Sequence, residues 1–177
     1  MNKKFGILFR ISGLPGSGKT EVSKLLHPKI NKIFGPTIMW SGDDLRKIFN
    51  IKSYKLKDRN NFGLQNIKLI KLINSQKINV IFATVGLSSE IRKRFRKEIP
   101  NYIEIVIKTN LDDLKKRNER KFYNNNSKNV WGKDIKIEYP KKPDVITIND
   151  FKKDLNFMRN FIFSKITKIK KLKSFMI

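Results

Sequence analysis

A glycine-rich stretch near the start of the chain carries the clearest chemical signal. Residues 13–20 satisfy the pattern G-x-x-x-x-G-K-S/T at every fixed position. Glycines let the backbone bend so that successive N–H groups face inward and form a nest for phosphate oxygens at a helix N-terminus. Lys19 could then reach the β- and γ-phosphates, and the Thr20 hydroxyl could bind magnesium. The pattern predicts a site for ATP made of Gly13, Leu14, Pro15, Gly16, Ser17, Gly18, Lys19 and Thr20.

A pair of carboxylates, Asp43 and Asp44, follows the next apolar stretch at 37–40. A carboxylate near a phosphate loop can accept a proton from an alcohol or help to hold Mg²⁺. The pair also stands where a helix would begin, a position that favours acidic side chains. Asp43 is therefore a candidate catalytic residue, and a helix N-cap is the structural alternative.

The elements that must position these residues alternate along the chain. Apolar, β-prone stretches predict five strands at 5–11, 37–40, 80–85, 102–107 and 145–148. Helical patterns fall at 19–26, 58–73, 90–98, 111–121 and 151–169, the last capped by Asp150, and 170–173 is expected to be a solvated tail. Strands and helices in alternation with short joins predict one α/β domain over 1–177, with a mostly parallel, doubly wound sheet.

The stretch 122–143 differs from the rest of the chain. It holds Asn124-Asn-Asn126, two prolines and the dipeptide Trp131-Gly132. A loop this long in a compact domain is usually functional, so we expect a lid that excludes water from a phosphoryl transfer. Trp131 could pack on a nucleotide base or simply anchor the loop.

Composition excludes several classes of site. The 177 residues include no cysteine and one histidine, His27, which excludes disulfides, thiol catalysis and a histidine-cluster metal site. The net charge of +25 would suit a polyanionic partner, but the lysines are spread over the whole length without an RNA-binding aromatic motif. We therefore expect a small nucleotide substrate rather than a nucleic acid. No apolar run approaches the roughly 20 residues of a membrane span, so we expect no membrane partner and a cytoplasmic protein.

The reaction class is narrowed by what accompanies the phosphate loop. Switch GTPases, motor ATPases and small-molecule kinases all use such a loop. The chain is short for most ATPase machines, and it lacks the Asn-Lys-x-Asp signature of guanine binding. A small kinase fits best.

Further blocks carry a family resemblance. Residues 41–46 read Ser-Gly-Asp-Asp-Leu-Arg, Tyr54 precedes Asp58-Arg59, 117–123 reads Arg-Asn-Glu-Arg-Lys-Phe-Tyr, and 132–144 holds the spaced Gly, Asp, Glu-Tyr-Pro and Pro-Asp of a closing block. In this order and spacing, the blocks resemble the adenylylsulfate kinase family over nearly the whole chain. The resemblance implies a P-loop kinase fold, a three-layer sandwich, and transfer of the γ-phosphoryl of ATP to a ribose 3′-hydroxyl. Members are often dimers, so a homodimer is a further expectation.

The resemblance also implies roles for single residues. Asp43 would act as base or magnesium organiser beside Lys19, and Tyr54 would stack on the acceptor base unless it is a half-buried core aromatic. Arg46 and Arg59 would bind the anionic groups of the acceptor, and Phe62 would lie on the same side. Arg117 and Arg120 would contact ATP from the lid. Surface charge is the alternative for Arg46 and Arg59.

Departures from the family pattern fall on the acceptor side. Ser41 replaces an aspartate, Phe62 an asparagine and Leu64 an arginine, and 86–89 lacks the serine-proline-tyrosine stretch. We therefore expect a nucleotide 3′-kinase like the family's divergent branch, whose acceptor is cytidine diphosphoramidate, used to decorate capsular polysaccharide. Adenylylsulfate as acceptor is the first alternative. A non-catalytic nucleotide- or RNA-binding module is the second.

Overall fold

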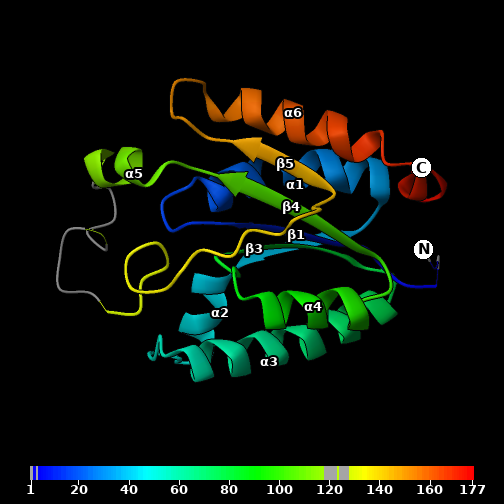
Figure 1. Cartoon of the computed structure of the whole chain (residues 1–177). Coiled ribbons are helices and arrows are strands. Elements are labelled where there is room, and N and C mark those ends of the chain that lie inside the picture. Colours follow the sequence, from blue (N-terminus) through cyan, green and yellow to red (C-terminus); the bar gives the residue numbers. More distant parts are fainter. Residues whose placement is uncertain (1, 3, 118–122, 124–127) are drawn as a thin grey trace.

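A five-stranded parallel sheet forms the centre of the computed structural model, which describes residues 2, 4–117, 123 and 128–177 (Figure 1). The strands are β1 (Leu8–Gly13), β2 (Thr37–Ser41), β3 (Asn79–Thr84), β4 (Tyr102–Lys108) and β5 (Val145–Ile148), and their order is β2-β3-β1-β4-β5. Every neighbouring pair is parallel. The central strand β1 is buried along its whole length, as its apolar sequence predicts.

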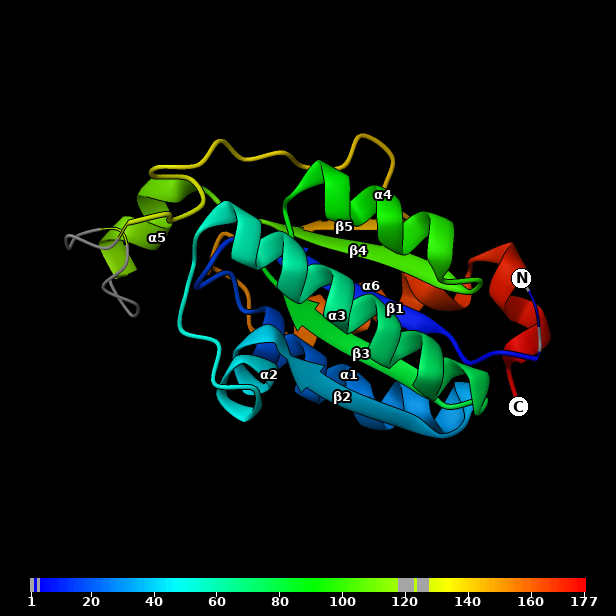
Figure 2. The ribbon, with the colours of Figure 1, turned by 90° about the horizontal axis from the view of Figure 1, so that it is seen from below.

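Helices cover both faces of this sheet. One face carries α1 (Lys19–Phe34), α6 (Leu155–Thr167) and the short 3₁₀ helix η1 (Lys170–Phe175), and the other carries α2 (Gly42–Ile48), α3 (Leu56–Ser75) and α4 (Ser89–Glu98) (Figures 1 and 2). Helix α5 (Leu111–Arg117) lies beyond the end of β4. The predicted three-layer α/β fold is confirmed.

Two apolar cores follow from the alternation of side chains along the strands. Ile7, Phe9 and Ile11 pack with α1 and α6, whereas Leu8 packs with residues of α3 and α4. Arg10 shares the face of Leu8 and is completely buried, so one position of this second core is charged. Arg10 also lines the cavity at the carboxyl ends of the strands.

Several predicted boundaries are wrong, and packing explains why. Helix α1 continues through Pro28 to Phe34, eight residues beyond the predicted end, because Ile30 and Phe34 are buried in the core. Asp154, not Asp150, caps α6, with its carboxylate accepting a hydrogen bond from the Phe157 N–H at 2.7 Å.

The end of the chain is also packed rather than solvated. Leu172, inside η1, is completely buried and belongs to the core with Ile162 and Ile166. The Lys171 ammonium donates to the Asp144 carboxylate at 2.6 Å. The predicted helix at 111–121 is present to Arg117, and its last four positions lie outside the described residues.

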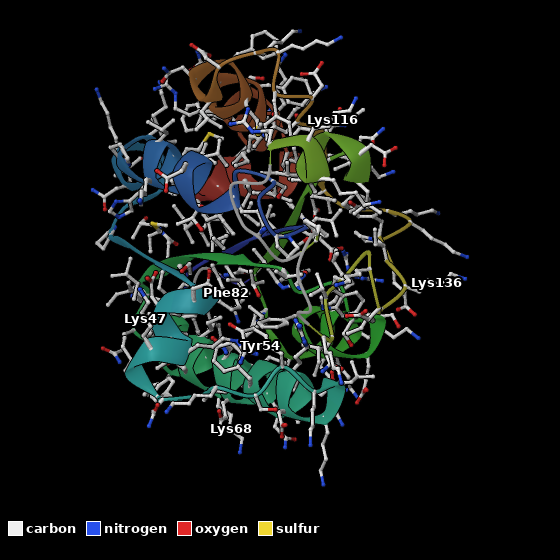
Figure 3. The ribbon with its side chains drawn as sticks, turned by 90° about the vertical axis from the view of Figure 1, so that its left-hand side faces the viewer. Lys47, Tyr54, Lys68, Phe82, Lys116 and Lys136 are labelled. Atoms are coloured by element: carbon white, nitrogen blue, oxygen red, sulfur yellow. The ribbon has the colours of Figure 1, made fainter. Side chains whose placement is uncertain are left out.

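The positively charged side chains labelled in Figure 3 are not gathered on one face. Lys47, Lys68, Lys116 and Lys136 lie around the periphery of Figure 3, on α2, on α3, on α5 and before β5. Over the described part of the chain, no helix is long and apolar enough to cross a membrane.

Candidate functional site

A cavity of about 600 Å³ opens beside the phosphate loop, at the carboxyl ends of the strands. Figure 3 faces this end of the molecule and labels two of the lining residues, Tyr54 before α3 and Phe82 on β3. Ligands of open α/β sheets bind at this edge. The walls join two groups of residues, the phosphate loop with α2 on one side and the aromatic and basic side chains of α3 on the other.

The phosphate loop is formed by the turn from β1 into α1. Gly16 and Gly18 have φ of +81° and +85°, in the left-handed region that favours glycine. The Lys19 ammonium donates to the Leu14 carbonyl at 2.6 Å inside the loop. Of the predicted loop residues, the cavity is lined by Pro15, Gly16, Gly18, Lys19 and Thr20. The other three loop residues do not line the cavity. The side chains of Leu14 and Ser17 are buried, and a Cβ on Gly13 would lie 2.5 Å from the Ile107 carbonyl oxygen.

Asp43 lies in the first turn of α2 and lines the cavity together with Thr20. The cap of α2 is Ser41, whose hydroxyl accepts from the Asp44 N–H at 3.1 Å while the Asp44 carboxylate accepts from the Ser41 N–H at 2.8 Å. The bonds that the Ser41 backbone N–H and the Ser41 hydroxyl donate to the Asp44 carboxylate lower the pKa of that carboxyl. Ser41 and Asp44 thus form the capping box of α2. The alternative role of Asp43 as the N-cap is therefore wrong.

Arg46 is held between two aromatic rings at the cavity wall. Its guanidinium carbon lies 4.4 Å from the ring centre of Tyr54 and 4.7 Å from that of Phe62, and Nη1 donates to the Ser53 carbonyl at 2.8 Å. The side chain of Tyr54 is 44% exposed, so it is not a core aromatic. The stack fixes the direction of a guanidinium that would otherwise be mobile.

Arg59 brings a second positive charge to the same wall. Its Nε donates to the Tyr54 carbonyl at 2.7 Å and its Nη2 to the Asn129 carbonyl at 2.5 Å. Burial, with Arg46 nearby, lowers the pKa of Arg59 to about 10. Two partly buried guanidiniums that contact the same ring and line the same wall favour an anion in the cavity.

The predicted lid, so far as it is described, packs against the site. Trp131 is buried with Leu14, Leu87 and Leu114, which shows that it anchors its segment, and it also lines the cavity. The Tyr123 hydroxyl donates to the Pro15 carbonyl at 3.3 Å.

Of the two predicted lid arginines, only one is described. The Arg117 guanidinium carbon lies 4.4 Å from the ring centre of Phe151, and the described walls of the cavity do not include it. Arg120 lies outside the described residues, so contact of either arginine with ATP stays a prediction.

Sequence reasoning missed an ionic cluster around Glu104, of which Arg10 lines the cavity. The sheet register pairs Arg10 on β1 with Glu104 on β4, and both side chains are at most 1% exposed. Glu104 lies 3.6 Å from Arg10, 3.8 Å from Arg92 and 2.8 Å from Arg96, and it accepts from the Tyr102 hydroxyl at 3.0 Å. Burial raises the pKa of Tyr102 to about 12, so the phenol stays a donor. The signal was one charged residue inside each of two apolar stretches.

The oxygen donors in the cavity fit magnesium rather than a metal held by protein ligands alone. The described residues hold no group of three or more His, Cys, Asp or Glu side chains that could form a metal cage. Thr20 and Asp43 supply one hydroxyl and one carboxylate to the cavity. Such a set suits Mg²⁺, which keeps several waters and takes its other ligands from substrate phosphates.

Comparison with known proteins gives concordant matches. A family model for adenylylsulphate kinase matches residues 5–148. A cytidine diphosphoramidate kinase of Campylobacter jejuni subsp. jejuni is 31% identical over 160 residues, 88% of this chain and 94% of that one. An adenylyl-sulfate kinase of Clostridium acetobutylicum is 29% identical over 158 residues, 86% and 78% of the two chains. The structure of the Mycobacterium tuberculosis APS kinase in complex with AMPPNP and APS matches with a TM-score of 0.80 at 20% identity, covering 93% of this chain and 99% of that one.

Proposed function

Because the chain belongs to the adenylylsulphate kinase family, we propose that it transfers the γ-phosphoryl group of ATP to the ribose 3′-hydroxyl of cytidine diphosphoramidate. The product would serve phosphoramidate decoration of a capsular polysaccharide. The observation that carries the proposal is one cavity that joins the phosphate loop to Asp43, Arg46 and Arg59. In this arrangement the loop would hold a triphosphate, and one carboxylate and two guanidiniums in the same walls would meet the acceptor.

The loop would bind the triphosphate of ATP. Its N–H groups and the N-terminus of α1 favour phosphate oxygens, and a phosphate could take the place of the Leu14 carbonyl as partner of Lys19. Thr20 and Asp43 would hold Mg²⁺. When bound, Mg²⁺ neutralises charge that develops on the phosphate oxygens.

Asp43 would orient the acceptor alcohol and take its proton. The 3′-oxygen forms a bond to the γ-phosphorus, the bond to the ADP leaving oxygen breaks, and the alcohol proton passes to the Asp43 carboxylate. Arg46 and Arg59 would hold the anionic anhydride of the acceptor, since guanidinium forks suit phosphate oxygens. Trp131, anchored in its apolar cluster, would help to keep water from the reacting atoms.

The identity of the acceptor rests on the acceptor-side residues and on the relatives. Of the two relatives described above, the cytidine diphosphoramidate kinase matches over more of both chains. Phe62 and Leu64 stand where the family pattern has an asparagine and an arginine. Adenylylsulfate is the second candidate, and the 29% identical adenylyl-sulfate kinase supports it.

The test measures ADP release with ATP, Mg²⁺ and each of the two acceptors. We expect a higher kcat/KM with cytidine diphosphoramidate, and a clear preference for adenylylsulfate would overturn that choice. D43N should abolish turnover while ATP binding, measured by calorimetry, is largely kept. K19A should weaken binding and turnover together.

A matched control for D43N is D112N, which changes an exposed aspartate on α5. This variant should behave as wild type. Unchanged turnover in D43N would assign Asp43 a structural role. The absence of any heat with ATP and Mg²⁺ would end the kinase proposal.

The net charge of +25 keeps RNA binding open as a second class of function. Binding to RNA would show a steep dependence on salt concentration. We expect no retention on RNA at moderate salt, because the labelled lysines lie on all sides rather than in one stripe (Figure 3). Retention that survives K19A would favour the RNA-binding alternative.

A further inference from the structure

The part of the cavity that lies between the sheet and α3–α4 has apolar walls and two buried polar side chains. Its walls include Phe82 of β3 and Phe95 of α4, which belong to one core cluster. Arg10 and Asn66 line the same cavity, at 0% and 2% exposure. We call Arg10, Asn66, Phe82 and Phe95 the inner subsite. Nothing in the mechanism above uses it.

Asn66 lines this space and carries a buried acceptor. Its Nδ2 donates to the Phe62 carbonyl one helical turn earlier, at 2.7 Å. A carbonyl oxygen can only accept, so this bond fixes the amide orientation and leaves Oδ1 as the remaining polar atom. Among the described residues, Oδ1 has no hydrogen-bond partner. A leucine of similar shape would pack here without that unpaired acceptor, so the amide points to a ligand.

Arg10 lines the same space and carries a buried donor. Its guanidinium carbon lies 5.0 Å from the ring centre of Phe95, and its terminal nitrogens contact Glu104, the Tyr102 hydroxyl and the Gly86 carbonyl. Its Nε has no partner within the described part of the chain. The surrounding contacts fix the guanidinium, so the donor is preorganised rather than mobile.

The charge of the cluster favours an electron-rich partner. Three guanidiniums, those of Arg10, Arg92 and Arg96, share the one carboxylate of Glu104 within 4 Å. The cluster is therefore net positive, and it lies against apolar walls where electrostatic interactions are stronger than in water.

We infer that the inner subsite binds an amino group of the acceptor next to an electron-rich atom, with Asn66 Oδ1 accepting from the amino group and Arg10 donating to its neighbour. The inference rests on the proposed function. Two parts of cytidine diphosphoramidate have this chemistry, the 4-amino and N3 edge of cytosine and the terminal P–NH₂ with its P–O oxygens. Uracil presents the reverse pattern at its edge, and a terminal phosphate lacks a nitrogen-borne donor.

The experiment compares N66L with N61L, which changes an exposed asparagine on the same helix. For each, kcat/KM is measured with cytidine diphosphoramidate, uridine diphosphoramidate and cytidine diphosphate. If the subsite binds the base, the wild type prefers both cytidine acceptors and N66L loses about tenfold on these two. If it binds the terminal group, the wild type prefers both diphosphoramidates and N66L loses about tenfold on those. Affinity for ATP should not change in N66L.

A second variant removes the donor. R10K keeps a positive charge beside Glu104 but lacks Nε. It should lower kcat/KM with the same acceptors for which N66L lowers it. Equal kcat/KM for N66L and N61L with every acceptor would overturn the inference about the inner subsite. Turnover by the wild type in the same assay would still uphold the proposed function. If the wild type phosphorylates no acceptor, the proposed function fails. Calorimetry of cytidine diphosphoramidate with the two variants then decides the subsite, and equal affinity overturns it.

Discussion

The buried cluster around Glu104 gives the sharpest test of the fold. The change is E104Q, which keeps the shape of the side chain and removes its charge. Glu104 is 1% exposed and neutralises Arg10, which is fully buried, whereas Arg96 is 49% exposed and keeps part of its hydration. Removing one partner of a buried ion pair costs about 3–5 kcal/mol. Because water screens Arg96, we expect the lower end, about 3 kcal/mol.

A double-mutant cycle isolates the interaction itself. R10M alone leaves Glu104 with Arg92 and Arg96, and R10M/E104Q removes both members of the buried pair. The loss in the double variant should therefore be smaller than the sum of the two single losses by about 1–3 kcal/mol. The free energy of unfolding is measured by urea titration with circular dichroism, and thermal midpoints should fall by about 6–12 °C for E104Q.

Two results would refute this reasoning. A loss below about 0.5 kcal/mol in E104Q would place Glu104 among ordinary surface residues. Additivity of the two single changes within about 0.5 kcal/mol would show that Arg10 and Glu104 are not coupled.

Three other predictions concern packing and capping. G63A should lose about 1–3 kcal/mol, since the new Cβ would lie 2.6 Å from Ile91 Cγ2. I91A costs stability by itself, but G63A should cost less in the I91A chain than in the wild type; an equal cost in both chains contradicts the contact. L172A should lose about 2–5 kcal/mol in urea titrations, because the side chain is fully buried; no loss would restore a solvated tail. S41A should lose about 1 kcal/mol at pH 7. The Ser41 hydroxyl donates to the Asp44 carboxylate at 2.8 Å and, after the Ser41 backbone N–H, helps to lower the pKa of Asp44. S41A removes the hydroxyl alone, so the part of the difference that comes from this bond should be complete above the ordinary value of 3.8 and decline as the pH falls through the lowered pKa; a constant difference would argue against it.

Local sequence patterns were sufficient for the sheet and for the phosphate loop. Five apolar stretches became five strands with boundaries shifted by at most three residues, because a strand buried on both faces is apolar throughout. The loop pattern is contiguous, so its backbone and the following helix could be placed without knowledge of distant residues. The cavity then joins this loop to Asp43, as the order of strand, loop and helix implies.

Features that depend on distant contacts could not be predicted in this way. The extension of α1 past Pro28 is stabilised by a core that only the folded sheet provides. Arg10 and Glu104 lie 94 positions apart and meet only through the register of β1 with β4. Asn66 looked like one more polar residue in a helix, and its unpaired oxygen is apparent only when the walls around it are in place.

The position of β1 has a consequence for how the two halves of the site respond to fluctuations. It is the middle strand of five and is hydrogen-bonded on both sides, so its amides should exchange with solvent only when the whole domain opens. The phosphate loop begins where this strand ends. The wall proposed to bind the acceptor rests on the seven-residue α2 and on the segment that carries Tyr54, which lie outside the sheet and should open at a lower free energy. A triphosphate would therefore meet a cradle that is already rigid, while the second substrate completes its own surroundings.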